Sequence, residues 1–437
     1  MKLRIEKAIY GGSGLAHQTE GKDAGKAIFI PFTLPGELVE AQQSEQKSGF
    51  GEATLLKVIE PYVGRIEPRC IHFGECGGCS YQHANYATQI AMKHDILRET
   101  LERAGLTGLP EIKPHTSEPW NYRNRIRLRI AEFEGKLRVG YLRRASSDFL
   151  PIQMCPISAP LLLRATEALL QLAQQDSNIS RWMQTTAEIE LFTTADETKL
   201  QITLFVRKHF AKGFPELCTK LQQLIPGLVG AGVAILAAET PGKKRKAQKT
   251  NQGASWGTEG LTYKTANESY WVSRGGFFQV NRFLIDELVS LATTNRSGAL
   301  AWDLFAGVGL FSRALTKTFK QVVAVEAAAD DLIRTFKGEG RRAIAATTLD
   351  FLRSAVLQRE RPDLIILDPP RAGVGTEACF LLARLKPKEI VYVSCDPSTL
   401  GRDLKAMVDS GYRLAELHMI DLFPQTFHLE TVAILQQ

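Results

Sequence analysis

The C-terminal part of the chain alternates short apolar runs with stretches of helical periodicity. Apolar runs of this length, bounded by turn residues, predict buried strands at 299–304, 321–326, 363–367 and 389–394. Helices are predicted between them, for example at 310–318 and 399–409. This alternation predicts an α/β domain with an open, largely parallel sheet from about residue 263 onward.

The last two predicted strands, 412–421 and 430–435, are joined by only a short loop. A parallel pair requires a crossover connection of a dozen or more residues, so one of these two strands should run antiparallel to its neighbours.

The first 60 residues have a different pattern. Short alternating runs at 27–31 and 37–40 are separated by glycine-rich turns at 11–14 and 35–36. This pattern predicts a small β-barrel of the OB type, a fold that often binds oligonucleotides. Its charge is balanced, with seven Lys and Arg against eight Asp and Glu through Glu60. If the barrel binds RNA, it does so without a strong electrostatic field.

Between these two regions lies a mixed segment. It contains a cysteine-rich stretch, a predicted helix at about 84–104, and β-like runs alternating with helices from about 110 to 262. A chain of 437 residues exceeds the usual size of one hydrophobic core. We therefore expect three domains, at 1–60, 61–262 and 263–437, with the helix at 84–104 able to pack on the C-terminal domain.

Composition places the chain among ordinary globular proteins, with 44% hydrophobic and 23% charged residues. No apolar run reaches membrane-spanning length, and the first seven residues lack the apolar stretch of a signal peptide. We therefore expect a cytoplasmic protein that needs neither a membrane nor an obligate protein partner. A net charge of +7 permits a polyanionic ligand.

Basic residues gather in two places. The run at 243–249 is predicted to be a solvated loop. In the segment 123–129, arginine occupies every second position, so four guanidinium groups should share one face of a strand. Two interpretations stay open for this face: an RNA backbone could neutralise it, or acidic residues on neighbouring strands could.

Three cysteines, Cys70, Cys76 and Cys79, form a C-x5-C-x2-C group, and Cys155 is a plausible fourth thiolate. Four thiolates suit zinc or an iron–sulfur cluster, and the spacing alone does not choose between the two. Cys218 and Cys379 lie in helical contexts and are predicted to be packing residues.

A glycine-rich loop at 303–310 follows one predicted strand and opens a helix. Its glycines, Gly307 and Gly309, allow a ligand to approach the backbone closely. Asp303, at the strand end, would repel a pyrophosphate but suits a cationic sulfonium. Glu326 ends the next strand, where a carboxylate can accept hydrogen bonds from both ribose hydroxyls. Together with Asp368, these residues favour S-adenosylmethionine over a nicotinamide dinucleotide.

Cys395 stands where the run 389–394 breaks into a turn, and Asp368 occupies the same position 27 residues earlier. Ligands bind at the carboxyl ends of strands in open α/β sheets, so a thiol there is predicted to be a nucleophile. A thiolate can add to carbon 6 of a uracil and so activate carbon 5, after which a base must remove a proton. Glu430 is the best candidate for that base.

The segments 303–309, 367–371, 394–397 and 428–430 together resemble the RNA uracil-5-methyltransferases, and the resemblance extends over essentially the whole chain. Within that family the chain is similar to the iron–sulfur branch that acts on 23S ribosomal RNA. The resemblance implies a Rossmann-like C-terminal methyltransferase domain, an N-terminal OB-type barrel known as a TRAM domain, and a central α/β iron–sulfur domain.

The resemblance also implies roles for individual residues. Cys395 would be the nucleophile and Glu430 the base that removes the proton. The cofactors would be S-adenosylmethionine and a 4Fe–4S cluster. The residues that would contact S-adenosylmethionine are Gln279, Phe305, Gly307, Gly309, Glu326, Asp350 and Asp368. The residues that would bind the cluster are Cys70, Cys76, Cys79 and Cys155.

The chain departs from the family pattern at two positions near these motifs. Asp396 follows the candidate nucleophile where typical members have Asn, and Leu310 replaces a polar residue after the glycine-rich loop. Two alternatives remain at this point. One is the same chemistry on transfer RNA, and the other is an iron–sulfur protein that binds RNA or senses redox state.

Overall fold

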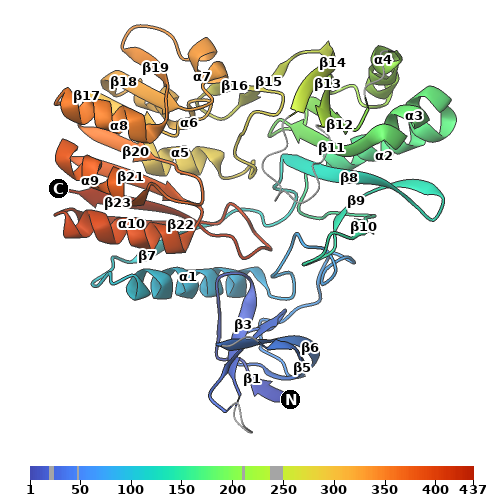
Figure 1. The fold of residues 1–437 in the computed structure, drawn as a ribbon, viewed down its shortest axis with the longest axis horizontal. Coiled ribbons are helices and arrows are strands. Elements are labelled where there is room, and N and C mark those ends of the chain that lie inside the picture. The colour runs from blue at the N-terminus through green and yellow to red at the C-terminus, as the bar shows by residue number, and fades with distance from the viewer. Residues whose placement is uncertain (19–23, 47–48, 209–211, 237–249) are drawn as a thin grey trace. The chain divides into compact units, whose positions relative to one another are not determined.

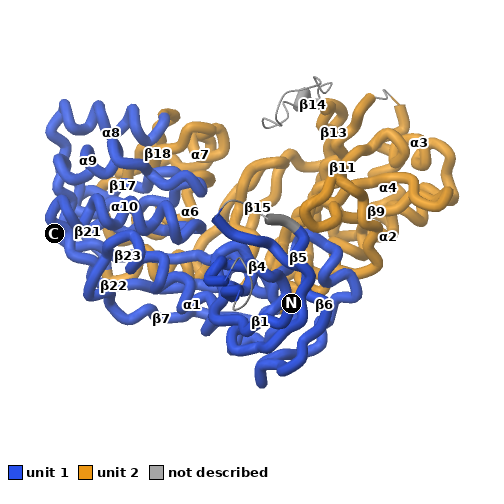
Figure 2. The backbone as a smooth tube through the Cα atoms, turned by 60° about the horizontal axis from the view of Figure 1, so that its bottom comes forward, with its two compact units in different colours: residues 1–119, 296–305, 347–437 blue, residues 120–295, 306–346 orange. Residues whose placement is uncertain are grey.

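The computed structural model describes residues 1–18, 24–46, 49–208, 212–236 and 250–437. The chain forms two compact units, coloured separately in Figure 2. Unit 1 comprises residues 1–119, 296–305 and 347–437, and unit 2 comprises residues 120–295 and 306–346. The basic run at 243–249 lies outside the described residues.

Unit 1 begins with a six-stranded sheet in the order β1-β5-β6-β4-β3-β2. Its strands are β1 (Lys2–Arg4), β2 (Lys7–Ala8), β3 (Ser13–His17), β4 (Ala27–Pro31), β5 (Leu38–Gln46) and β6 (Phe50–Glu60). Alternate side chains of these strands point to one side and form a small core of their own that includes Ile28, Ile30 and Val39. The runs at 27–31 and 37–40 are thus confirmed as strands, although the second extends to Gln46.

The second sheet of unit 1 contains, in order, β17-β20-β21-β23-β22-β7. Its strands are β17 (Gly298–Leu304), β20 (Leu364–Leu367), β21 (Glu389–Ser394), β23 (Glu430–Gln436), β22 (Arg413–Ile420) and β7 (Ile112–His115). β17, β20 and β21 are parallel, whereas β23 is antiparallel to both of its neighbours. The prediction of one reversed strand near the C-terminus is therefore confirmed.

Helices pack in a row along this sheet, each against the next (Figure 1). In spatial order they are α8 (Thr348–Leu357), α9 (Gly375–Leu385), α10 (Pro397–Asp409) and α1 (Tyr86–Arg103). α1 is the helix expected at 84–104, and its contact with α10 confirms that it packs against the C-terminal part of the chain. The close approach occurs at Gly401, where an added Cβ would lie 2.9 Å from the Cβ of Ala104.

Unit 2 contains a seven-stranded sheet in the order β10-β9-β8-β11-β12-β13-β14. Its strands are β8 (Arg125–Phe133), β9 (Lys136–Leu142), β10 (Phe149–Pro151), β11 (Thr186–Thr193), β12 (Leu200–Val206), β13 (Leu228–Leu236) and β14 (Thr250–Gly257). Three helices contribute to its core with their apolar faces: α2 (Pro160–Gln175), α3 (Ser177–Thr185) and α4 (Phe214–Leu224).

The remaining elements of unit 2 lie between this sheet and residue 346 in sequence. They are the hairpin β15 (Gly260–Lys264) and β16 (Ser269–Ser273), α5 (Ile285–Thr293), α6 (Leu310–Leu315), α7 (Asp330–Thr335) and the parallel pair β18 (Phe319–Glu326) and β19 (Arg341–Ala345). β19 was not predicted, because its sequence carries two arginines and lacks an apolar run.

The α/β class predicted for the C-terminal region is confirmed, and the four predicted strands and both predicted helices are present. The helix expected at 310–318 ends earlier, at Leu315. The division into domains at 60 and 262 stays a prediction, since compactness groups the chain into two units with other boundaries. Among the described helices, none combines the length and the apolar character that a membrane crossing requires.

Candidate active site

The strand register of unit 1 places Cys395 opposite Glu430. β21 and β23 are antiparallel, and Ser394 pairs with Thr431. Cys395 directly follows the first of these residues, and Glu430 directly precedes the second. In an antiparallel pair, adjacent positions of this kind face each other across the ladder. Because β23 runs antiparallel to β21, its first residue, Glu430, lies at the edge of the sheet where the parallel strands β20 and β21 end.

Asp368 and Arg371 come to the same edge from the neighbouring strand. β20 ends at Leu367 and is parallel to β21, with Leu367 beside Tyr392. Asp368 follows directly, and its backbone N–H donates to the carbonyl of Leu304 at 3.3 Å. Arg371 follows three residues later, and one of its guanidinium nitrogens lies 3.1 Å from Nδ1 of His428. We call Cys395, Glu430, Asp368, Arg371 and Tyr10 the catalytic corner.

Burial and charge in the catalytic corner favour the protonated forms of Cys395 and Glu430. Burial, together with the nearby carboxylates of Glu430 and Asp368, raises the pKa of Cys395 to about 11, and Arg371 opposes this shift. Glu430 is only 4% exposed, and burial raises the pKa of its carboxyl group well above the ordinary value. Arg371 also opposes this second shift, so its charge stabilises the ionised form of both groups.

Tyr10 reaches the catalytic corner from the turn between β2 and β3. Its hydroxyl donates to the backbone carbonyl of Cys395 at 3.3 Å, across 385 positions of sequence. Its ring meets Phe427 edge-on, with centroids 5.4 Å apart. Burial, followed by the charge of Asp396, raises the pKa of the phenol to about 12, so it remains a hydrogen-bond donor at neutral pH.

The turn that carries Tyr10 depends on glycine. Gly11 and Gly12 have φ of 108° and 90°, in the left-handed region that side chains with a Cβ rarely adopt. An added Cβ at Gly12 would lie 3.0 Å from Cβ of Ser80 and 3.4 Å from the ring of Phe427. Glycine therefore lets this turn pack tightly enough for Tyr10 to reach Cys395.

The segment that leads into Glu430 is held by helix α1. Gln89 and Gln425 exchange two hydrogen bonds, one through the side-chain amides at 3.0 Å and one from the backbone N–H of Gln425 at 2.9 Å. Lys93 and Asp421 form an ion pair at 2.6 Å in which both side chains are 1% exposed. Breaking a buried pair of this kind leaves an uncompensated charge, so α1 fixes the path of residues 421–429.

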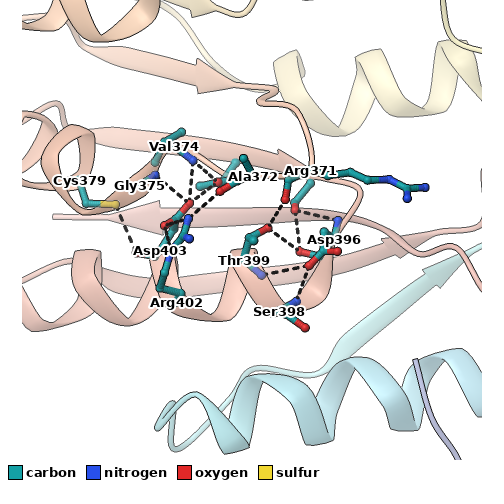
Figure 3. Close-up of polar contacts among 12 residues, drawn as sticks. Arg371, Ala372, Val374, Gly375, Cys379, Asp396, Ser398, Thr399, Arg402 and Asp403 are labelled. Carbon is teal, nitrogen blue, oxygen red and sulfur yellow. Dashed lines mark hydrogen bonds and ion pairs between the residues drawn. The ribbon is translucent and has the colours of Figure 1, made fainter. Parts of the chain in front are cut away.

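Asp396 is the N-cap of helix α10 and directly follows Cys395. Its carboxylate accepts hydrogen bonds from the backbone N–H groups of Ser398 and Thr399, at 3.0 and 3.1 Å (Figure 3). Asn and Asp serve equally well at this helix position because each has an oxygen that can accept these bonds. The departure from Asn at this position therefore leaves the local structure unchanged.

The glycine-rich loop lies in unit 2 from Ala306 onward. Gly307 and Gly309 have φ of 55° and 84°, and Gly309 is the N-cap of α6. The backbone N–H of Gly307 donates to one carboxylate oxygen of Glu326 at 3.0 Å, and that of Ala328 donates to the other at 3.0 Å. A Cβ at Gly307 would meet no atom within 4 Å, so a ligand can approach the backbone there.

The other predicted cofactor contacts have defined surroundings. Phe305, in unit 1, has φ of 65°, an unusual value for a residue with a side chain that is often found at functional sites. In unit 2, Gln279 is 7% exposed, and its backbone carbonyl accepts from Asn124 at 2.9 Å. In unit 1, Asp350 lies in the first turn of α8, bonded to the cap residue Thr347 and paired with Arg353 at 3.3 Å. The observed contacts of Asp350 are thus those of a helix start.

Cys70, Cys76 and Cys79 lie on one loop of unit 1, residues 70–79, which we call the cysteine loop. All three are partly exposed. The backbone N–H of Cys70 donates to the buried amide of Gln82 at 3.0 Å, and that of Cys76 donates to the carbonyl of His72 at 2.9 Å. Over the part of the chain that is described, no group of three or more His, Cys, Asp or Glu side chains is arranged to hold a metal.

Cys155 belongs to unit 2, where the hydroxyl of Tyr141 lies 3.9 Å from its sulfur. The two remaining cysteines are confirmed as packing residues. Cys218 and Cys379 are 0% and 1% exposed, and burial raises the pKa of each to about 12.

The arginine strand, β8, has acidic cross-strand partners on β11. Arg127 bonds Glu188 at 2.6 Å, Arg129 approaches the same carboxylate at 3.6 Å, and Arg125 lies 3.5 Å from Glu190. Arg123 lies outside the strand. The second interpretation of this sequence pattern therefore describes the structure, and an RNA backbone is not needed to neutralise these groups.

The catalytic corner joins Tyr10 to four other residues of unit 1: Cys395 and Glu430, predicted as catalytic, with Asp368 and Arg371. In unit 2 the structure brings Glu326 to Gly307, which lies in one loop with Gly309. Sequence reasoning missed Tyr10. Its only signal is the Gly11-Gly12-Ser13-Gly14 turn that follows it, which was interpreted as a simple connection.

Comparison with known proteins agrees with this geometry. The family described as tRNA (Uracil-5-)-methyltransferase matches residues 85–337 and 332–437. A chain from Aquifex aeolicus named "Uncharacterized RNA methyltransferase" is 32% identical, covering 100% of this chain and 98% of that one. The 23S rRNA (uracil(1939)-C(5))-methyltransferase RlmD of Shewanella piezotolerans is 31% identical, covering 100% and 95%.

Among solved structures, the tRNA (uracil-54, C5)-methyltransferase of Pyrococcus abyssi, in complex with S-adenosyl-L-homocysteine, is similar over 99% of both chains. The TM-score is 0.75 and the sequence identity is 22%. This likeness shows that the two proteins share a fold.

Fold, strand-end thiol and family match together define an S-adenosylmethionine-dependent RNA methyltransferase. More narrowly, the chain belongs to the tRNA (uracil-5-)-methyltransferase family and is an RNA uracil-5-methyltransferase.

Proposed function

We propose that this enzyme methylates carbon 5 of one uridine in 23S ribosomal RNA through a covalent bond between Cys395 and carbon 6. The observation that carries the proposal is the opposition of Cys395 and Glu430 across β21 and β23. It supplies a nucleophile and a base at one edge of the sheet, as this reaction requires. Curated relatives that act on 23S ribosomal RNA match nearly the full chain and support this choice of substrate.

The reaction begins when the thiol of Cys395 gives its proton to solvent and the sulfur forms a bond to carbon 6 of the uracil. The electron pair displaced from the 5,6 double bond makes carbon 5 nucleophilic. The pKa of the thiol, raised to about 11, means that the resting thiol is protonated at neutral pH. Arg371, the cation that opposes this shift, stabilises the thiolate as it forms.

S-adenosylmethionine supplies the methyl group, which carbon 5 takes from the sulfonium. Glu430, ionised at this step, then removes the proton from carbon 5, and the 5,6 double bond re-forms. The bond between carbon 6 and sulfur breaks, and the departing thiolate of Cys395 takes a proton back from solvent. A carboxylate whose pKa is raised by burial is a stronger base than an exposed one, which suits this step. The products are 5-methyluridine, S-adenosylhomocysteine and a proton.

The residues predicted to contact the methyl donor would hold it. The glycine-rich loop with Gly307 and Gly309 would let it approach the backbone, and Glu326 would accept hydrogen bonds from the ribose hydroxyls. Each carboxylate oxygen of Glu326 accepts one backbone N–H bond and has a second lone pair for this purpose. The remaining proposed contacts are Gln279, Phe305, Asp350 and Asp368.

The four cysteines Cys70, Cys76, Cys79 and Cys155 would hold a 4Fe–4S cluster. Their chemistry supports this assignment, because thiolates are the ordinary ligands of such clusters and three of the thiols are partly exposed on one short loop. The cluster would stabilise a central domain, residues 61–262, and no step of methyl transfer passes through it.

Residues 1–60 would form the TRAM domain, an OB-type barrel that contacts RNA, and residues 263–437 would form the methyltransferase domain. The self-contained core of β1–β6 supports the first assignment. The enzyme would work in the cytoplasm, where its RNA substrate is made.

Transfer RNA is the alternative substrate, because a relative that shares the fold acts on it. An iron–sulfur protein that only binds RNA or senses redox state is the alternative from another class, and the assembled catalytic corner argues against it.

The test is methylation of two transcripts, 23S ribosomal RNA and a pool of transfer RNA, by the purified enzyme with S-adenosylmethionine. Digestion and mass spectrometry locate any 5-methyluridine. We expect the modification at one position of the ribosomal RNA. Modification of transfer RNA alone would overturn the choice of substrate, and modification of neither would overturn the activity.

A further inference from the structure

Asp403 lies in the middle of helix α10 and is fully buried, at 0% exposure. A buried carboxylate is costly unless hydrogen-bond donors surround it. Two donors can be followed in Figure 3: the backbone N–H of Val374 at 2.8 Å and Nε of Arg402 at 2.8 Å. The third donor is the hydroxyl of Tyr392, at 2.7 Å. The N–H of Gly375 adds a longer bond of 3.4 Å.

These bonds tie α10 to the loop 369–375, which carries Arg371. Two neighbours of Asp403 on the same helix add to the connection. Arg402 donates to the carbonyl of Ala372 at 2.8 Å, and the hydroxyl of Thr399 donates to the carbonyl of Arg371 at 2.9 Å. The backbone of Arg371 and of the residues that follow it is therefore held by one helix.

Gly373 shows how closely the loop and the helix pack. Its φ is 72°, and an added Cβ would lie 2.3 Å from Oδ2 of Asp403 and 2.7 Å from a guanidinium nitrogen of Arg402. Only glycine fits there, because these polar atoms already occupy the space a side chain would need.

The same helix also holds the nucleophile. α10 begins at Pro397 with Asp396 as its N-cap, directly after Cys395. The loop with Arg371 and the turn with Cys395 are thus both fastened to the first two turns of α10. Figure 3 shows the guanidinium of Arg371 extending away from the Asp403 contacts, free of the bonds that hold its backbone.

We propose that Asp403 is a positioning residue, which fixes the cation of Arg371 beside the thiol of Cys395 by clamping the loop 369–375 to α10. The proposal rests on the proposed function of Cys395 as nucleophile. A cation held near a thiol favours the thiolate, and this benefit falls with distance. If Asp403 merely stabilised the fold, its loss would lower stability without changing the reactivity of Cys395.

Titratable groups from several elements surround Cys395. Glu430 comes from β23, Asp368 and Arg371 from the loop after β20, Tyr10 from the turn after β2, and Asp396 from the start of α10. Arg371 is the cation among those that act on the thiol. Displacement of its side chain should therefore raise the pKa of Cys395.

The test measures the rate at which iodoacetamide alkylates Cys395 in the full-length enzyme as a function of pH, read by peptide mass spectrometry without RNA or methyl donor. Two variants weaken the clamp, Asp403→Asn and Arg402→Met. Arg402 is about half exposed, so Arg402→Met should fold even if the substitution of the buried Asp403 prevents folding. Lys405→Met is the matched control, since Lys405 lies on the same helix and pairs with Asp409 instead.

We expect alkylation at pH 8.5 to slow about 3- to 10-fold in both clamp variants, equivalent to a rise of roughly half to one pKa unit, and to stay unchanged in the control. In an Arg371→Met background, Asp403→Asn should have no further effect, because the cation it positions is gone. A folded Arg402→Met variant with the wild-type pH profile would overturn the proposal. So would equal slowing by Asp403→Asn in both backgrounds.

These outcomes are independent of turnover. If Cys395 proved not to be the nucleophile, methylation would survive its replacement, whereas the alkylation profile would still report whether Asp403 positions Arg371.

Discussion

The catalytic corner and the cysteine loop both present thiols, but the protein prepares them differently. In the catalytic corner, strand register, a capped helix and several side chains from distant segments hold Cys395 in place. In the cysteine loop, the thiols of Cys70, Cys76 and Cys79 are partly exposed on a turn-rich segment held largely by backbone hydrogen bonds. A nucleophile must be positioned by the chain itself, whereas cluster ligands can be drawn into place by the iron they bind.

Among the variants that test the difference between the catalytic corner and the cysteine loop, replacement of the proposed base Glu430 should change the methylation rate most. Glu430→Gln keeps the shape of the side chain but cannot accept the proton from carbon 5. We expect the methylation rate to fall ~10²- to 10⁴-fold, because that is the usual contribution of a positioned general base. Turnover is measured with radiolabelled S-adenosylmethionine.

Glu416→Gln is the matched control for this variant. Glu416 lies on the neighbouring strand β22 and is largely exposed, and its partners are Lys113 and His418. A Glu430→Gln enzyme that turns over at the wild-type rate would contradict the role of Glu430.

Removal of a cluster ligand should affect cofactor content more than chemistry. In Cys70→Ser we expect iron and sulfide content and visible absorbance to fall, with thermal stability lowered. Cys218→Ser, at a buried packing position, should retain its iron. Full iron content in Cys70→Ser would contradict the ligand assignment.

If the four cysteines hold the proposed cluster, its reduction in the wild-type enzyme, with the fold intact, should leave the methylation rate nearly unchanged. A strong change of rate on reduction would show that the cluster does more than stabilise the central domain.

The reactivity of Cys395 should depend on pH in a direction that the structure defines. Burial and two carboxylates raise its pKa to about 11, so alkylation should keep rising with pH up to that value. Arg371 opposes the shift, so Arg371→Met should move the profile to higher pH. Iodoacetamide labelling across the pH range measures both. A thiol half-titrated at or below pH 8.5 would contradict the buried, carboxylate-flanked environment of Cys395.

Tyr10 should make the smallest contribution. Tyr10→Phe keeps the ring on Phe427 and removes only the hydrogen bond to the carbonyl of Cys395. One neutral hydrogen bond contributes about 0.5–1.5 kcal/mol, so we expect kcat to fall roughly 2- to 10-fold. Tyr62→Phe is the control, because Tyr62 is 41% exposed. An unchanged kcat in Tyr10→Phe would exclude the hydroxyl from the positioning of Cys395.

Sequence reasoning found the parts of this enzyme that local pattern determines. Apolar runs located β17, β18, β20 and β21, and the short connection before 430 revealed the reversed strand. Since Cys395, Asp368 and Glu430 lie at strand ends, locating the strands also located these candidate site residues. The pattern was less informative for β19, whose arginines conceal a strand.

Contacts between distant segments could not be predicted. Tyr10 and Cys395 are 385 positions apart, and nothing in either segment reveals the other. The burial of Asp403 could not be predicted either, because it depends on donors supplied by the loop 369–375. The arginines of β8 were ambiguous for the same reason, since their partners Glu188 and Glu190 lie on another strand.

The most direct test of the central claim is covalent trapping. The enzyme is incubated with S-adenosylmethionine and ribosomal RNA that contains 5-fluorouridine, whose carbon 5 carries no proton for Glu430 to remove. We predict a stable adduct between RNA and protein that maps to Cys395 by peptide mass spectrometry and is absent in Cys395→Ala. Absence of an adduct with the intact enzyme, on ribosomal and transfer RNA alike, or an adduct that persists in Cys395→Ala, would contradict the account.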